Sequence, residues 1–227
     1  SREEADIVVT VLKSFRWQSQ VRTAIITGEG VCVGATASRE GLSMHIPQAA
    51  RRVATIVINT LLRRYVGDRF PWGALQLNHN SVSSRHRDKG NEGLSFVLLV
   101  GSYTDGSFNC PHENLRTPGG SHGLIVLTDG TQEHFSEPFQ GDRYSIVAFR
   151  HTKLRQATPR DVQQLVELGF PLKSPFRSSS GARTGSVSQA AVSTAGLRTQ
   201  MCHDAMRTNI HGTMDPVSYT HLTLPTN

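Results

Sequence analysis

The sequence lacks a large set of cysteines, long apolar runs and a signal layout, which are features of many secreted and membrane proteins. Its three cysteines, Cys32, Cys110 and Cys202, are too few and too scattered for a disulfide framework, which favours a reducing compartment. No apolar run approaches the ~18 residues that a membrane-spanning helix needs. The chain starts at Ser1 and shows no basic-then-apolar signal layout, so nothing else indicates a compartment. We therefore expect a soluble protein without a membrane partner and leave its localisation unknown.

A strong charge of one sign is also lacking. The formal net charge of the 227 residues is +6, and no segment is a basic arm of the kind that binds nucleic acid by charge alone. A nucleic-acid partner is therefore possible but not indicated. Hydrophobic residues make up 37% of the chain, and 20 glycines and 10 prolines interrupt it. This composition is globular and excludes collagen, a coiled coil and a wholly disordered chain.

The composition divides the chain near residue 176. From Arg177 to about Gln200 the sequence is rich in Ser, Gly, Ala and Thr and has almost no large apolar residue. Such a segment buries too little surface to offset the entropy of ordering. We therefore predict one domain over residues 1–176 and a disordered tail over residues 177–227. The end of the tail, from Asp215 onward, resembles translated sequencing-adaptor sequence, and we assign it no function.

Within the domain, short apolar runs alternate with turn signals. One strong helical pattern begins at Pro47 and ends at Tyr65, before Gly67, and a second helix is expected over Pro159–Leu168. The expected strands are Ile7–Leu12, Val21–Thr27, Val31–Ala35, Trp72–Val82, Leu94–Tyr103, Ser107–Cys110, Leu124–Thr128 and Tyr144–Arg150. A long helix beside many short antiparallel strands predicts a β-sandwich or barrel supported on one face.

The candidate metal ligands are His86, Asp88 and His134. On an extended strand, residues two apart point the same way, so His86 and Asp88 can converge on one ion while Arg87 faces away. A third ligand from His134 completes two imidazoles and one carboxylate. This set holds non-haem Fe(II) and leaves coordination positions open.

A candidate anion site follows nine residues after His134. Arg143 and Ser145 lie two apart on an expected strand and therefore share a face. A guanidinium beside a hydroxyl can bind a carboxylate at the end of a small dicarboxylic acid. Pro138 and Gly141 indicate a turn between the two segments, so we expect His134 and Arg143 on neighbouring strands.

In this order and spacing, His86-x-Asp88, His134 and Arg143-x-Ser145 resemble the signature of the Fe(II)/2-oxoglutarate-dependent dioxygenases. The resemblance covers about residues 70–151 and is closest to a branch common in protist genomes. It also includes Leu77-Asn78, Asn91-x-Gly93-x-Ser95, Gly101-x-Tyr103-Thr104-x-Gly106 and His134-x3-Pro138-Phe139-x-Gly141-x-Arg143-Tyr144-Ser145.

The resemblance implies a mainly β fold with flanking helices, the double-stranded β-helix or jelly roll. It implies that His86, Asp88 and His134 bind catalytic Fe(II), and that Arg143, helped by Ser145, binds the distal carboxylate of 2-oxoglutarate. The implied reaction uses O2 to hydroxylate an unidentified protein side chain or nucleobase and releases succinate and CO2. Ascorbate is an expected stimulant.

Several alternatives stay open. The domain could be a jelly-roll binding module without turnover, or a cupin-like protein that holds another metal. Asn78, with Gln76 and Asn80, could line the cofactor pocket or face solvent, and Tyr103 could reach the cofactor or serve as a core aromatic. The other imidazoles that could rival His134 are His79, His112, His122 and His151. None of them precedes a matching Arg-x-Ser, and we expect His79 in the core.

Two further expectations concern the substrate. The Asn109–Gly123 insert is the expected lid or substrate loop. In the nucleic-acid repair branch, a second Arg shares the strand face of the Arg-x-Ser pair. Here Arg150 is an odd number of residues past Arg143 and should face away, so this chain matches that branch poorly.

Overall fold

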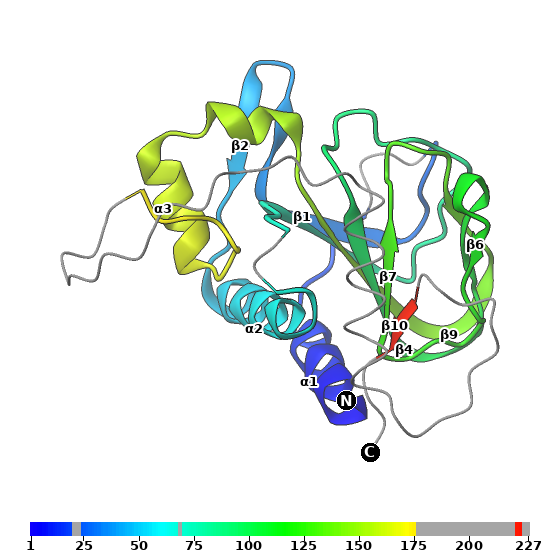
Figure 1. Cartoon of the computed structure of the whole chain (residues 1–227). Helices are drawn as coiled ribbons and strands as arrows, with labels where there is room; N and C mark the ends of the chain where they lie inside the picture. The colour runs from blue at the N-terminus through cyan, green and yellow to red at the C-terminus, as the bar shows by residue number, and fades with distance from the viewer. Residues whose placement is uncertain (20–23, 68–69, 176–220, 224–227) are drawn as a thin grey trace.

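The computed structural model describes residues 1–19, 24–67, 70–175 and 221–223, which form two antiparallel β-sheets with helices packed on one side (Figure 1). The helices are α1 (Arg2–Lys13), α2 (Ala49–Val66) and α3 (Pro159–Glu167), with short 3-10 turns η1 (Pro111–Glu113) and η2 (Thr152–Gln156). The strands are β1 (Glu29–Ser38), β2 (Gly41–His45), β3 (Ala74–His79), β4 (Ser95–Asp105), β5 (Phe108–Cys110), β6 (Leu115–Arg116), β7 (Leu124–Thr128), β8 (Phe135–Ser136), β9 (Phe139–Phe149) and β10 (His221–Thr223).

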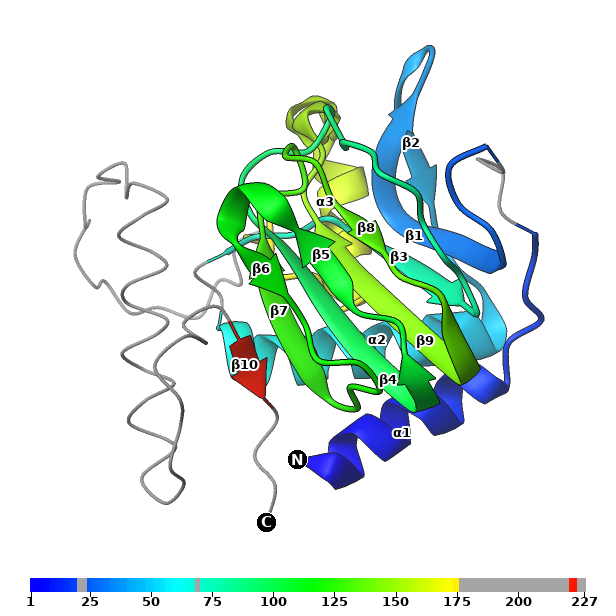
Figure 2. The same ribbon diagram turned by 90° about the vertical axis from the view of Figure 1, so that its right-hand side faces the viewer.

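The two sheets face each other in the expected jelly-roll arrangement. The large sheet has the strand order β10-β7-β4-β9-β3-β1-β2, and the small sheet has the order β6-β5-β8. Figure 2 shows the small sheet in front of the large one, with α1 and α2 behind. The fold class predicted from the sequence is therefore confirmed.

Alternation along β4 separates the two sides of the large sheet. Phe96 and Leu98 are buried in the main core, beneath the helices. Val97 and Leu99 belong to a second buried cluster between the sheets, together with Phe108 of β5. Successive side chains of a strand point to opposite faces. The strands of the large sheet therefore contribute side chains both to the core beneath the helices and to the space between the two sheets, where the candidate site lies.

The expected strand Ile7–Leu12 is wrong, because these residues lie within α1. Val8 and Leu12 are fully buried and four residues apart, and Ala5 continues the same stripe. This is helical spacing, whereas the run of β-branched residues had indicated a strand. Helix α1 packs beside α2 on the large sheet.

Helix α2 confirms the predicted long helix and ends at Gly67, whose φ is +73°. Val53 is one of the apolar residues of this helical pattern, but it is 60% exposed, whereas the polar residues Thr55 and Asn59 are fully buried. A hydrophobic periodicity counts only apolar residues, so it does not detect a buried helix face that contains polar residues. No helix in the described part of the chain is long and apolar enough to cross a membrane.

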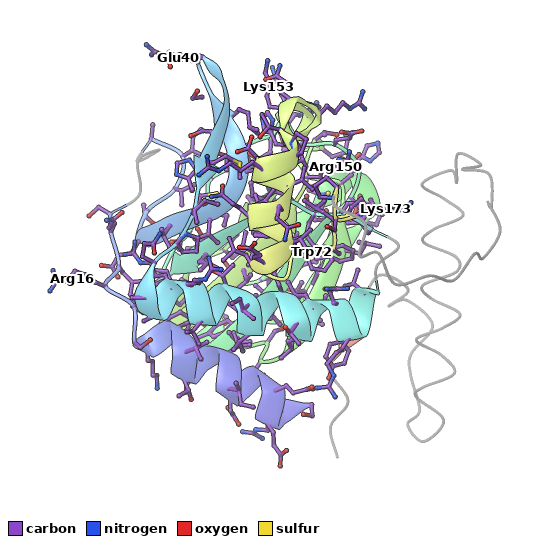
Figure 3. All side chains as sticks on the ribbon, turned by 90° about the vertical axis from the view of Figure 1, so that its left-hand side faces the viewer. Arg16, Glu40, Trp72, Arg150, Lys153 and Lys173 are labelled. Carbon is purple, nitrogen blue, oxygen red and sulfur yellow. The ribbon has the colours of Figure 1, made fainter. Side chains whose placement is uncertain are left out.

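The region before β3 differs most from expectation. Of the expected strand Val21–Thr27, residues 21–23 lie outside the described residues, and the remainder forms a turn with one bridge between Ile26 and Ser83. Strand β1 pairs with β3 and with β2. No strand was expected at the position of β2. Glu40 marks the tip of this β1–β2 hairpin in Figure 3.

Most of the tail, residues 177–220 and 224–227, lies outside the described residues, so its predicted disorder stays a prediction. The exception is β10, whose three residues pair with β7 at the edge of the large sheet. The bounds of the domain and of the tail therefore stay predictions. A sheet edge offers unpaired N–H and C=O groups to any extended segment, whatever its side chains, so composition does not reveal such pairing.

Asn59 connects α2 to two other parts of the core. Its Oδ1 accepts from Trp72 Nε1 and its Nδ2 donates to the Leu168 carbonyl, both at 2.8 Å. Figure 3 shows Trp72 near the point where α3 approaches α2. We expect Asn59→Leu to lower the free energy of unfolding by about 2–3 kcal/mol, because it leaves both buried partners unsatisfied.

For a chain of this size, that loss corresponds to a melting temperature about 4–12 °C lower, measured by circular dichroism. Val53→Ala, on the exposed side of the same helix, is the matched control and should change stability by less than about 0.5 kcal/mol. Equal melting temperatures for Asn59→Leu and the control would contradict the structural role of Asn59.

Candidate metal and cofactor site

The three predicted metal ligands come together in the structure. One ligand atom from each of His86, Asp88 and His134 lies within 4.8 Å of the others. Nε2 of His134 is 3.8 Å from Oδ2 of Asp88, and His134 is buried. In the described part of the chain, this is the one group of three or more His, Cys, Asp or Glu residues with such spacing.

The backbone route to this geometry differs from the expected one. His86 and Asp88 do not lie on a regular strand, since His86 forms a single bridge with His134. The backbones of His86 and His134 exchange hydrogen bonds of 3.0 and 3.1 Å. Asp88 N donates to the Gly130 carbonyl at 2.9 Å. These contacts place both ligand segments side by side without a continuous strand.

Hydrogen bonds orient both imidazoles. Nδ1 of His86 lies 2.7 Å from the Ser84 carbonyl, and Nδ1 of His134 lies 2.9 Å from the Gln132 carbonyl. A carbonyl oxygen only accepts, so each Nδ1 carries the proton and each Nε2 keeps its lone pair. This is the tautomer that a metal-binding histidine needs, and the donor set therefore fits a divalent ion such as Fe(II).

Arg143 lies on β9 as a buried cation without an acidic partner. Only 3% of it is exposed. Its Nη1 donates to the Ser81 carbonyl at 3.0 Å, its Nε has no hydrogen-bond partner, and no Asp or Glu of the described residues forms an ion pair with it. Burial lowers the pKa of the guanidinium, opposed by Tyr103, yet an arginine remains charged in proteins.

A buried, unpaired charge is costly, so this arrangement suits a bound anion. The walls beside the guanidinium are aromatic: its carbon lies 5.3 Å from the Phe139 ring centroid and 5.6 Å from that of Tyr103. Burial raises the pKa of Tyr103, which keeps its phenol neutral. Tyr103 is not among the cavity-lining residues, which favours the core-aromatic interpretation.

Ser145 and Asn78 lie beside Arg143 on the inner face of the large sheet. Ser145 shares the face of Arg143 on β9, and Asn78 on β3 is its register partner, with Asn78 Nδ2 3.2 Å from Ser145 Oγ. Asn78 and Gln76 line the cavity. Asn80 does not, and its side chain accepts from the Arg143 N–H at 2.9 Å.

The expectation that His134 and Arg143 lie on neighbouring strands is wrong. His134 immediately precedes β8, which belongs to the small sheet, whereas Arg143 is on β9 in the large sheet. The turn between them carries the chain from one sheet to the other. The metal-ligand group and the guanidinium therefore face a shared interior from opposite sheets.

Both groups line one cavity of about 800 Å³. The cavity is also lined by Arg87 and Lys89, and Asp88 is the one acidic side chain among the residues that line it. Small and apolar walls come from Val97, Val147, Phe108, Phe149 and Ser136. The cavity is large enough for a small dianion together with part of a second molecule, and its charge favours anions.

The Asn109–Gly123 insert does not line this cavity, so its expected role as a substrate loop is not supported. The segment completes β5 and forms η1 and β6, and Arg116 pairs with Glu137 at 2.8 Å. The hairpin of β1 and β2 reaches the cavity instead, through Thr36, Ala37 and His45. Alternation along β1, in which Cys32 and Thr36 share a face, is the sequence signal that could have indicated this wall.

The other candidate residues have partners outside the His-Asp-His group. His79 contacts Glu29 and Asp142 at 2.8 and 2.7 Å, and His122 lies 3.2 Å from Asp6. His151 lines the cavity, and its side chain caps η2. Arg150 directly follows β9, lies 3.5 Å from Glu92 and does not line the cavity, in agreement with its odd separation from Arg143. Cys32 lines the cavity, and burial raises the pKa of its thiol to about 12, so the thiol is neutral near pH 7.

Comparison of the sequence with protein-family models and with curated proteins gives no match. Similar solved structures include NgTET1 in complex with 5mC DNA, at 12% identity, a TM-score of 0.49 and coverage of 67% of each chain. An oxidoreductase of the 2OG-Fe(II) oxygenase family from Burkholderia pseudomallei is 17% identical (TM-score 0.47, 65% of this chain, 78% of that one). A prolyl-4-hydroxylase from Pseudomonas putida is 14% identical (TM-score 0.39, 66% and 85%). These similarities are distant, so the functional argument rests on the residues of this site.

Proposed function

We propose that this protein is a non-haem Fe(II)- and 2-oxoglutarate-dependent dioxygenase. The observation that supports the proposal is one cavity that contains both a His-Asp-His group and a buried arginine, which has no acidic partner among the residues that the structure describes. A metal-binding group alone would suit many proteins. A cosubstrate with two carboxylates that binds the metal through one end requires a separate cation in the same cavity for the carboxylate at its other end.

Each residue has a distinct role in this proposal. His86, Asp88 and His134 would hold Fe(II) through two Nε2 atoms and one carboxylate, with the imidazoles held by the Ser84 and Gln132 carbonyls. Bound Fe(II) supplies open positions for 2-oxoglutarate and O2 and couples oxidation of 2-oxoglutarate to succinate and CO2 with hydroxylation of a substrate.

The remaining roles belong to the large sheet. Arg143 would bind the distal carboxylate of 2-oxoglutarate with help from the Ser145 hydroxyl, which Asn78 orients. Phe139 and Tyr103 shield the guanidinium from water, which strengthens its attraction for an anion. The substrate, a protein side chain or a nucleobase, would enter beside the β1–β2 hairpin, and ascorbate would help to keep the iron reduced.

The test measures succinate release from 2-oxoglutarate by the protein with Fe(II), ascorbate and O2, first without added substrate and then with candidate peptides and nucleic acids. We expect slow release without substrate, together with 2-oxoglutarate binding in anaerobic calorimetry. Metal binding without 2-oxoglutarate binding would support the cupin-like alternative. Cosubstrate binding without succinate release under any condition would support a jelly-roll binding module.

A further inference from the structure

His79 joins three strands of the large sheet on the face opposite the cavity. Its Nδ1 lies 2.8 Å from Oε2 of Glu29 on β1, and its Nε2 lies 2.7 Å from Oδ1 of Asp142 on β9. The ring also stacks on Tyr144, with centroids 4.6 Å apart, and lies 5.2 Å from Trp17. The His79 side chain is 18% exposed, so the surrounding groups hold it firmly.

The two contacts specify the protonation of the ring. A carboxylate accepts hydrogen bonds, so an imidazole that bonds to a carboxylate through each nitrogen must carry a proton on both. His79 in this arrangement is an imidazolium between two negative charges. Loss of one proton would leave one ring nitrogen facing a carboxylate with no hydrogen between them, and that contact would become repulsive.

This ion cluster lies directly behind the proposed carboxylate site. The residues on either side of His79 are Asn78, which contacts Ser145, and Asn80, which accepts from the Arg143 N–H and donates its own N–H to the Arg143 carbonyl at 2.8 Å. Asp142, the partner of His79 on β9, immediately precedes Arg143. The cluster therefore joins β3 to β9 at the residues that hold Arg143 and Ser145.

We propose that His79 is a positioning residue for 2-oxoglutarate: its imidazolium, held between Glu29 and Asp142, keeps β3 and β9 in the register that aims Arg143 and Ser145 at the distal carboxylate. This inference rests on the proposed function. It makes the affinity for 2-oxoglutarate depend on a side chain that touches neither the cosubstrate nor the metal ligands.

The groups around the ring make its contacts specific. From β1 and β9 the ring faces Glu29, Asp142 and Tyr144, and Trp17 covers it without a charge. Burial and the two carboxylates raise the pKa of Tyr144 to about 12, so this phenol stays neutral. A side chain that reaches both carboxylates with an N–H donor is therefore what joins β1, β3 and β9 at this point.

The experiment is anaerobic calorimetry of 2-oxoglutarate binding to the Fe(II)-loaded protein. We compare the wild type with His79→Phe, which keeps an aromatic ring against Tyr144 but has no N–H. We expect His79→Phe to bind 2-oxoglutarate about threefold to tenfold more weakly than the wild type, the usual size of an indirect coupling. The Fe(II) affinity of the variant should be unchanged.

Two further variants keep the result interpretable. Arg64→Met removes a different ion pair, with Glu4 between α1 and α2, and should bind 2-oxoglutarate like the wild type. Glu29→Gln leaves the ring and the cavity in place and should also weaken 2-oxoglutarate binding, which tests the role of the ion cluster if His79→Phe does not fold. Wild-type affinity for 2-oxoglutarate in both His79→Phe and Glu29→Gln would overturn the positioning role alone. Absence of 2-oxoglutarate binding in the wild type would overturn the proposed function and this inference with it.

Discussion

Arg143→Ala is expected to weaken 2-oxoglutarate binding by roughly tenfold to a hundredfold, as measured by anaerobic calorimetry. The guanidinium is a buried cation of the cavity that pairs with no acid in the described part of the chain, and loss of a charge-assisted contact costs about 1.5–3 kcal/mol. Fe(II) binding should survive, because Arg143 is not in the His-Asp-His group. The variant therefore separates cosubstrate binding from metal binding.

Arg143→Lys is the matched variant for this experiment. An ammonium keeps the charge but lacks the planar fork that binds a carboxylate through two parallel hydrogen bonds, so it should recover only part of the affinity. Full recovery by lysine would show that charge alone matters. If Arg143→Ala binds 2-oxoglutarate like the wild type while remaining folded by circular dichroism, the distal carboxylate lies elsewhere in the cavity.

His134→Ala is expected to abolish stoichiometric Fe(II) binding and to reduce succinate release to background. Loss of a residue that only orients a ligand commonly costs about 10–100-fold in metal affinity, and loss of a ligand should cost more. His86→Ala and Asp88→Ala should behave alike, since the three side chains converge on one point. Metal analysis of the anaerobically loaded proteins measures the effect.

The control is His122→Ala. This imidazole lies beside Asp6 and the backbone of Gly101, outside the cavity, so its removal should leave the iron content unchanged. Iron retained in all three ligand variants would show that the metal, if bound, is held elsewhere. Loss of iron from His122→Ala as well would point to general destabilisation rather than to a specific site.

Local patterns predicted the elements whose side-chain periodicity matches their burial. Strands β4, β7 and β9 were expected from alternating or continuous apolar runs, and α3 from its Pro159 start. The same reasoning failed for α1, where β-branched residues at helical spacing indicated a strand. It misplaced the buried face of α2, because Asn59 is buried through hydrogen bonds to Trp72 and Leu168, two partners that are distant in the sequence.

The sequence by itself determined which residue types could perform the chemistry: a His-x-Asp pair, a later His and an Arg-x-Ser, in an order that resembles one superfamily. Only the tertiary structure decided that His134 lies beside the small sheet and Arg143 in the large one, and that the β1–β2 hairpin rather than the Asn109–Gly123 insert forms a wall of the cavity. It also decided that no Asp or Glu among the described residues pairs with Arg143. The reason is physical. Spacing along a strand specifies which face of the sheet a side chain occupies. Which residues lie opposite it across a cavity depends on the packing of segments that are distant in the sequence, and local periodicity carries no information about that packing.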